Sequence, residues 1–241
     1  MSAPVAASAG HVAHHFDDAE QQYASAELGM WLFLATEVLF FGGVFCAYAV
    51  YRYWYPEAFA EGSHHLDLPL GTVNTAILLL SSLTMALAVR AAQTSEQRAI
   101  VRNLGFTVLL GLGFLGIKSY EYYHKFEERL VPGPNFVTRH PELAQQPGGE
   151  SRYPPPAEVK EEPRYKLSST AELFFSLYFV MTGLHALHMV IGIGILGVLI
   201  VAAVRGAFSA AYFTPVEMTG LYWHFVDIVW VFLFPLLYLI H

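Results

Sequence analysis

Five long stretches with almost no charged side chains constrain the fold more than any other feature of this sequence. They cover residues 28–51, 70–89, 103–117, 173–204 and 218–240. About 20 helical residues, rising 1.5 Å each, cross the roughly 30 Å hydrocarbon core of a bilayer. The third stretch is the shortest, but the side chain of Lys118 directly after it can reach back to the membrane surface. The sequence therefore predicts an all-α integral membrane bundle of five transmembrane helices.

The polar parts of the chain divide it into a tail, a membrane domain and one long loop. Residues 1–27 contain no Lys or Arg and lack the basic and apolar regions of a signal peptide, which predicts a retained polar tail. Residues 28–241 form the predicted membrane domain. The connection at about 128–168 contains three consecutive prolines and a glycine pair, which is typical of an extended surface segment. Two interpretations of this loop remain open: it lies across a neighbouring subunit, or it has no partner.

The short connections between the stretches carry their basic residues on one side. Four arginines, Arg90, Arg98, Arg102 and Arg205, fall on the side that also holds the N-terminus, whereas Arg52 falls on the other side. Because short cytoplasmic connections are enriched in Lys and Arg, the N-terminus is expected in the cytoplasm and the C-terminus outside.

Composition excludes two classes of function. The chain has 13 Lys and Arg against 20 Asp and Glu, a formal charge of -7, so we expect no nucleic-acid partner. Its one cysteine, Cys46, rules out a disulfide framework and a thiolate metal cluster. Because Cys46 lies within an apolar stretch, the sequence predicts a small buried side chain there.

Glu37 lies near the middle of the first predicted span. A charged carboxylate at the bilayer centre costs about 2.5–3.5 kcal/mol on insertion scales, so the group should be protonated or paired. Two interpretations remain open at this point. Glu37 is either a proton relay or lipid-contact site, or a neutral acid hydrogen-bonded to a neighbouring helix.

Two further pairs of polar residues lie inside the predicted spans. His185 and His188 are three residues apart in the fourth span, and His224 and Asp227 are three apart in the fifth. A haem or metal site is one interpretation, but metal sites between helices gather a larger set of His and carboxylate ligands. Hydrogen bonding between helices is the favoured role. The same role is predicted for a group of smaller polar residues: Asn74, Thr75, Ser81, Ser82, Thr84 and Thr182.

Five motifs, one in each span, carry a resemblance to a known family. They are GMWLFLATEVLFF at 29–41, NT at 74–75, YEYY at 120–123, TGLHALH at 182–188 and YWHFVDIVW at 222–230. In order and relative spacing they resemble cytochrome c oxidase subunit III, and the resemblance covers about residues 28–241.

The resemblance implies a non-catalytic subunit of an oxidoreductase complex in a bacterial cytoplasmic membrane. Such a subunit has no redox centre of its own, since haem and copper belong to partner subunits. It packs directly against subunit I, with subunit II and further respiratory subunits in the complex, and it holds phospholipid between its helices. It supports the stability and proton uptake of a complex that reduces oxygen to water and pumps protons.

The resemblance also implies roles for particular residues. Glu37 matches the membrane glutamate of the family that reacts with carbodiimides, and His188 matches a histidine close to it, so we expect a hydrogen bond between them. Trp223 and Arg205 are expected lipid contacts.

Other functions remain as alternatives. The sequence departs from seven-helix members of the family, because two N-terminal spans that form one wall of a lipid cleft have no counterpart here. The homologous subunit of a quinol oxidase or a nitric-oxide-reductase-associated protein fits the same motifs. A small proton-coupled transporter that uses Glu37 and Asp227 is less favoured, because the sequence shows no internal repeat.

Overall fold

The computed structural model describes residues 12–133, 136 and 170–240. Within these ranges the chain forms helices and no strand. The helices are α1 (Ala19–Trp54), α2 (Pro56–Ser63), α3 (Leu68–Gln93), α4 (Gln97–Glu127), α5 (Ala171–Val204) and α6 (Thr214–Tyr238). All except the short α2 are long and apolar enough to cross a membrane, which confirms the predicted all-α fold with five spans. Most of the predicted tail at 1–27 is described, but most of the predicted loop at 128–168 lies outside the described residues.

Two of the long helices extend well beyond the apolar stretches that predicted them. Helix α1 begins at Ala19, where the Asp18 carboxylate accepts a hydrogen bond of 2.7 Å from the backbone N–H of Gln21. This cap satisfies one of the backbone donors that a helix start leaves free. Helix α4 contains 31 residues, about 46 Å of helix, although its uncharged stretch covers only residues 103–117.

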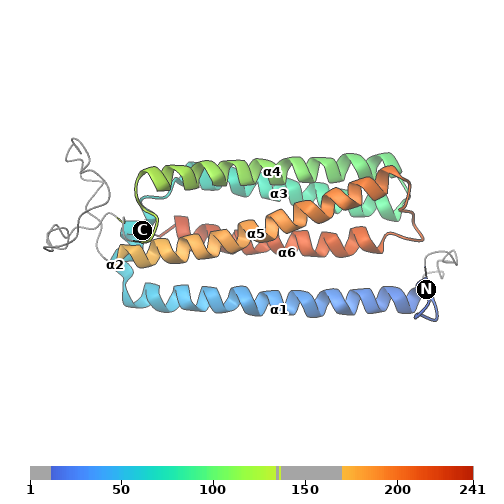
Figure 1. Cartoon of the computed structure of the whole chain (residues 1–241), viewed down its shortest axis with the longest axis horizontal. Helices are drawn as coiled ribbons and strands as arrows, with labels where there is room; N and C mark the ends of the chain where they lie inside the picture. Colours follow the sequence, from blue (N-terminus) through green and yellow to red (C-terminus); the bar gives the residue numbers. More distant parts are fainter. Residues whose placement is uncertain (1–11, 134–135, 137–169, 241) are drawn as a thin grey trace, which may run out of the picture.

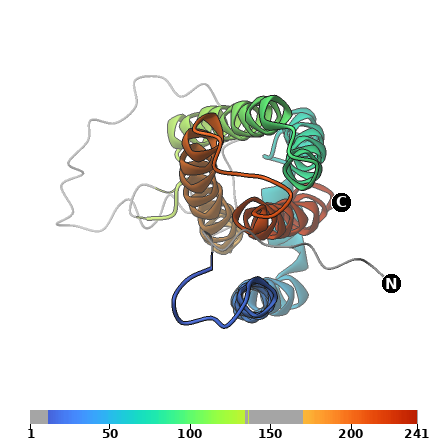
Figure 2. The same ribbon diagram turned by 90° about the vertical axis from the view of Figure 1, so that its right-hand side faces the viewer.

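Helices α3, α4, α5 and α6 pack together as a four-helix bundle, and α1 runs alongside it (Figure 1). The view along the bundle shows α1 set apart from the other four and joined to them through α2 (Figure 2). In the most apolar 18-residue segment of α1, only 11% of the residues are buried within the chain, compared with 50% in the corresponding segment of α6. The rest of the described chain therefore leaves most of the apolar surface of α1 uncovered.

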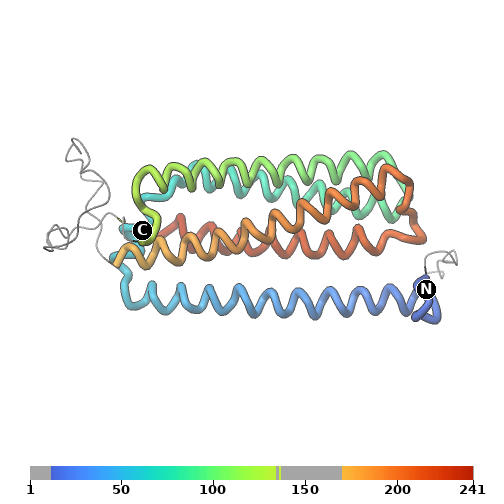
Figure 3. The backbone as a smooth tube through the Cα atoms, viewed as in Figure 1, coloured from blue at the N-terminus to red at the C-terminus, as the bar shows by residue number. Residues whose placement is uncertain are grey.

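Helix α5 runs obliquely across the bundle (Figure 3). Close packing at its middle depends on two glycines, because Trp223 of α6 lies against Gly192 of α5 and Gly111 of α4. A Cβ atom would lie 2.9 Å from the Trp223 ring at Gly192, and 3.0 Å from it at Gly111. The indole is fully buried between these helices.

The odd number of spans places the two ends of the described chain at opposite ends of the bundle (Figure 1).

The sequence prediction of a buried Cys46 is wrong. Cys46 is exposed on α1 and not buried, because it lies on a part of that helix that the bundle does not cover.

Candidate functional site

The candidate site joins α1 to the bundle through Glu37 and His188. The Nε2 atom of His188 lies 3.1 Å from Oε2 of Glu37, which confirms the hydrogen bond that the sequence predicted. The other ring nitrogen, Nδ1, lies 2.8 Å from the backbone carbonyl oxygen of Leu184. Both side chains are mostly enclosed, with exposed fractions of 18% for Glu37 and 12% for His188.

The two hydrogen bonds of His188 indicate which ring nitrogen donates to which partner. A carbonyl oxygen only accepts, so the Nδ1 atom of His188 carries a hydrogen and donates it to Leu184. The Nε2 atom then meets Glu37 either as an acceptor from a neutral carboxylic acid or as the donor of an imidazolium. In both cases one hydrogen lies between Nε2 and Oε2 and joins the two side chains.

A mostly apolar pocket of about 370 Å³ opens beside this pair. It is lined from three helices: Met30, Phe33 and Glu37 of α1, His188, Ile191 and Ile195 of α5, and Met218, Thr219 and Tyr222 of α6. The Tyr222 hydroxyl donates a hydrogen bond of 3.0 Å to the backbone oxygen of His188, which fixes α6 to α5 at the pocket. A pocket with this mostly apolar lining suits an alkyl chain, and the Glu37–His188 pair supplies a polar site at its wall.

The other predicted polar residues divide into two groups. Nδ1 of His224 lies 2.7 Å from the Ser82 hydroxyl oxygen, so the predicted bond between helices is confirmed there. For His185 and Asn74 that prediction is wrong, because these buried side chains have no hydrogen-bond partner among the described residues, whereas Asp227 faces the Ser82 hydroxyl of α3. His185 instead lies between the rings of Phe114 and Trp230, with centroid distances of 5.4 and 5.2 Å.

His185 and His188 therefore do not act as one site. Residues three apart on a helix differ by about 60° in direction, so the two rings point to different neighbours. His185 is fully buried inside the four-helix bundle, whereas His188 faces α1. Among the residues that the structure describes, no group of three or more His, Cys, Asp or Glu side chains could hold a metal ion.

Apart from Asn74, the smaller polar residues join the helices as predicted. The confirmed bonds are Trp230 Nε1 to Thr75 at 3.0 Å, Trp223 Nε1 to Ser81 at 2.9 Å, Thr84 to Thr107 at 2.8 Å and Tyr122 to Thr182 at 2.5 Å. Because Trp223 is fully enclosed by protein, the predicted lipid contact of this residue is wrong. Arg205 is exposed at the end of α5, and its lipid contact stays a prediction.

Sequence reasoning missed a buried charged cluster around Lys118. The lysine does not extend to the membrane surface, because only 4% of it is exposed and its ammonium lies 2.9 Å from the Glu121 carboxylate. Nζ of Lys118 also donates to the hydroxyls of Tyr178 at 3.2 Å and Tyr238 at 2.8 Å. Both tyrosine hydroxyls in turn donate to the Glu121 Oε1 atom, at 2.8 and 2.6 Å.

This Lys118 cluster joins α4, α5 and α6 and leaves its ion pair fully hydrogen-bonded. The aromatic rings of Tyr178 and Trp230 also lie 5.1 Å from the ammonium, which is within the range of cation–π attraction. The spacing of Lys118 and Glu121, three residues apart on one helix, was the signal that could have predicted the ion pair.

Comparison with known proteins agrees with the motifs and the geometry. The family described as "Cytochrome c oxidase subunit III" matches residues 8–127 and 161–241 of the chain. Cytochrome c oxidase subunit 3 of Synechocystis sp. is 32% identical over 213 residues, 88% of this chain and 74% of that protein. The same subunit of Thermostichus vulcanus is 32% identical over 214 residues, 88% of this chain and 86% of that protein.

A quinol oxidase subunit is similar to a comparable degree. Cytochrome bo(3) ubiquinol oxidase subunit 3 of Pseudomonas aeruginosa is 29% identical over 233 residues, 97% of this chain and 93% of that protein. The match of the family over most of the chain, with five membrane spans, confirms the resemblance seen in the motifs. The chain therefore belongs to the cytochrome c oxidase subunit III family and is a multi-pass membrane subunit of the haem-copper oxidases.

Proposed function

We propose that the chain is a subunit without redox centres that sustains the turnover of its oxidase from the cleft between α1, α5 and α6. In this proposal the apolar pocket takes a phospholipid acyl chain, and the Glu37–His188 pair holds one proton at its wall. The observation that carries the proposal is the hydrogen bond of 3.1 Å between these two side chains at the edge of a pocket of about 370 Å³.

The exposed apolar surface of α1 supports a place for the chain against subunit I. Large side chains on this helix, among them Trp31, Leu32 and Leu39, are more than half exposed. Within a membrane such a surface packs against lipid or against another helix. Subunit I covers part of it in our proposal, and lipid fills the cleft on the other part. Subunit II and further subunits then contact the complex elsewhere.

The distribution of arginines supports an orientation with the N-terminus in the cytoplasm. The turn between α3 and α4 and the end of α5 carry Arg90, Arg98, Arg102 and Arg205, and these residues lie at the end of the bundle where the described chain begins (Figure 1). Because arginines concentrate at the cytoplasmic side of bacterial spans, this end faces the cytoplasm.

Two versions of this function differ in the electron donor of the oxidase. Relatives named as cytochrome c oxidase and as ubiquinol oxidase subunits share similar identity with the chain. We infer cytochrome c as the donor, with quinol as the second candidate. In both cases other subunits bind the electron donor, so the proposed role of this chain is the same.

Affinity purification through a tag on this chain tests the assignment. We expect a complex that consumes oxygen with reduced cytochrome c and shows the spectrum of haem a. A complex with haem o that oxidises ubiquinol would establish the quinol version. A chain that purifies without any haem-containing partner would overturn the proposal.

A further inference from the structure

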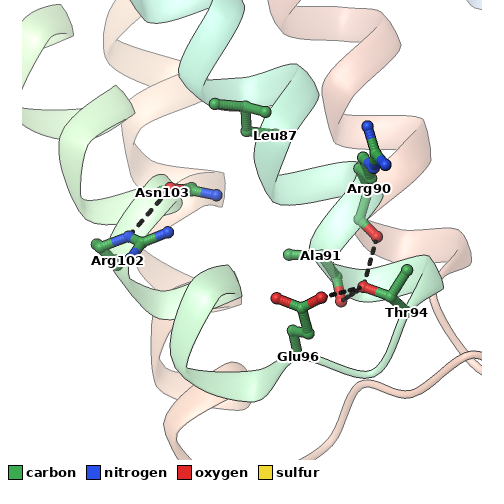
Figure 4. Close-up of a pocket in the computed structure, with 7 residues that line it drawn as sticks. All are labelled: Leu87, Arg90, Ala91, Thr94, Glu96, Arg102 and Asn103. Carbon is green, nitrogen blue, oxygen red and sulfur yellow. Dashed lines mark hydrogen bonds between the residues drawn. The ribbon is translucent and has the colours of Figure 1, made fainter.

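A second pocket lies between α3 and α4, at the turn that joins these two helices. Its volume is about 220 Å³, and its polar lining comes from Arg90, Thr94, Glu96, Arg102 and Asn103. Figure 4 shows Arg102 and Asn103 of α4 on one side, Arg90 and Thr94 of α3 on the other, and Glu96 at the turn between them. The pocket shares no residue with the cleft beside α1.

Among the described residues, the two arginines of this pocket have no carboxylate partner. Neither Arg90 nor Arg102 forms an ion pair within the described part of the chain. The Nε atom of Arg102 makes only a long contact of 3.5 Å with the Asn103 side-chain oxygen. Both guanidinium groups therefore have donors left for an anion, and a guanidinium matches the geometry of phosphate oxygens.

The carboxylate in the pocket belongs to Glu96. Its Oε1 atom lies 3.2 Å from the Thr94 hydroxyl, whose one hydrogen can also go to the backbone oxygen of Arg90 or Ala91, and the Glu96 side chain makes no capping bond at the start of α4. Glu96 is exposed, so its second oxygen can accept from a ligand. The pocket thus offers two cationic groups and one anionic group.

These groups follow one another along the helix axes in a fixed order. Leu87, with 43% of its side chain exposed, lies on the membrane side of the pocket. Arg90 follows about one turn, or roughly 4.5 Å, closer to the helix end. Glu96 lies beyond Arg102 by about 9 Å of helical rise, at the outermost point of the turn. From membrane to water the order is apolar, cationic, anionic.

We propose that this pocket binds the headgroup of phosphatidylethanolamine. The acyl and glycerol part lies against Leu87, the phosphate lies between Arg90 and Arg102, and the ammonium group donates to Glu96. The order of groups in the pocket matches the order of groups in this lipid. A phosphatidylglycerol headgroup has no cation for Glu96, and the quaternary ammonium of phosphatidylcholine has no N–H to donate. The site requires only that the helices span a membrane, so it does not depend on the role proposed for the cleft.

Photolabelling of the purified oxidase complex tests this site. The probe is a phosphatidylethanolamine with a photoreactive group near the glycerol, and the measured quantity is the label on the segment of residues 87–103. Label on α5 beside the cleft serves as the internal reference. Arg102→Gln removes a pocket cation, and Arg98→Gln is the matched control, since Arg98 is an exposed arginine of the same helix end that does not line the pocket.

We expect Arg102→Gln to reduce the label on this segment about three- to tenfold and Arg98→Gln to change it less than about twofold. Unlabelled phosphatidylethanolamine should compete better than phosphatidylglycerol or phosphatidylcholine in the unchanged protein. Glu96→Gln should abolish that preference while it retains binding. The cleft label should be the same in all variants.

Three results would overturn the proposal. The first is equal labelling of the Arg102→Gln and Arg98→Gln variants. The second is competition by phosphatidylglycerol that equals that of phosphatidylethanolamine in the unchanged protein, since Glu96 would then have no role. The third is competition by inorganic phosphate, which would indicate a site for the free anion.

Discussion

The carboxyl group of Glu37 and the imidazole of His188 meet at 3.1 Å across a separation of 151 residues in the sequence. This contact joins α1, which is the least buried of the long helices, to the four-helix bundle. It also satisfies two polar groups that would each be costly within a membrane. The contact therefore contributes both to the position of α1 and to the chemistry of the cleft.

Replacement of Glu37 should separate these two contributions. An amide can still donate to Nε2 of His188, so Glu37→Gln should leave assembly of the complex largely intact. Glu37→Ala leaves the His188 nitrogen unpaired in a low-dielectric site, at a cost of about 1–3 kcal/mol. The half-life of the complex at a fixed temperature should be shorter for the alanine variant. Equal half-lives of the two variants would contradict the pairing.

The Lys118 cluster should be sensitive to the loss of one charge and tolerant of the loss of both. Lys118→Met leaves the Glu121 carboxylate buried without its cation, which typically costs about 3–5 kcal/mol. A second change, Glu121→Gln, removes that charge and should recover part of the loss. Thermal unfolding of the complex measures both variants. A double variant no more stable than Lys118→Met would mean that the ion pair is not the source of the effect.

The contact between Gly192 and Trp223 offers a test of the packing with a control on the same helix. An alanine Cβ at Gly192 would lie 2.9 Å from the indole ring, so Gly192→Ala should destabilise the chain by about 1–3 kcal/mol. A Cβ atom at Gly194 would have no neighbouring atom of the described chain within 4 Å. Gly194→Ala should therefore be neutral or slightly stabilising. The midpoint of thermal unfolding compares them, and equal midpoints would refute the close packing.

The isolated chain should bind neither haem nor copper. His185 and His188 point to different neighbours, and His224 already bonds to Ser82, so the histidines of the spans do not converge on one point. Metal analysis and the Soret absorbance of the detergent-purified subunit measure this directly. One haem or one copper ion per chain would contradict the prediction.

The spans and the Glu37–His188 contact were predictable for different reasons. Long uncharged stretches require helices in a membrane, since every backbone polar group must be satisfied within the chain. This argument depends on composition alone, and it located all five long helices. The contact between Glu37 and His188 was predicted from the resemblance of the motifs, because spacing alone does not show which helices are neighbours.

The two tyrosine partners of Lys118 could not be predicted because they are distant from it in sequence. Tyr178 and Tyr238 reach the lysine from α5 and α6, and only the packing of these helices reveals that the charge is satisfied inside the bundle. The wrong prediction of a lipid contact for Trp223 has a related cause. That contact was expected from the resemblance, but Gly111 and Gly192 leave room for this ring between the helices.

Selective removal of this chain from the purified oxidase complex tests the central claim most directly. The measured quantities are the haem spectrum and the rate of oxygen consumption over successive turnovers, before and after the removal. The account predicts an unchanged haem spectrum and an initial rate that is largely kept, followed by faster loss of activity during turnover. Loss of a haem signal together with the chain, or a depleted complex that stays active as long as the intact one, would contradict it.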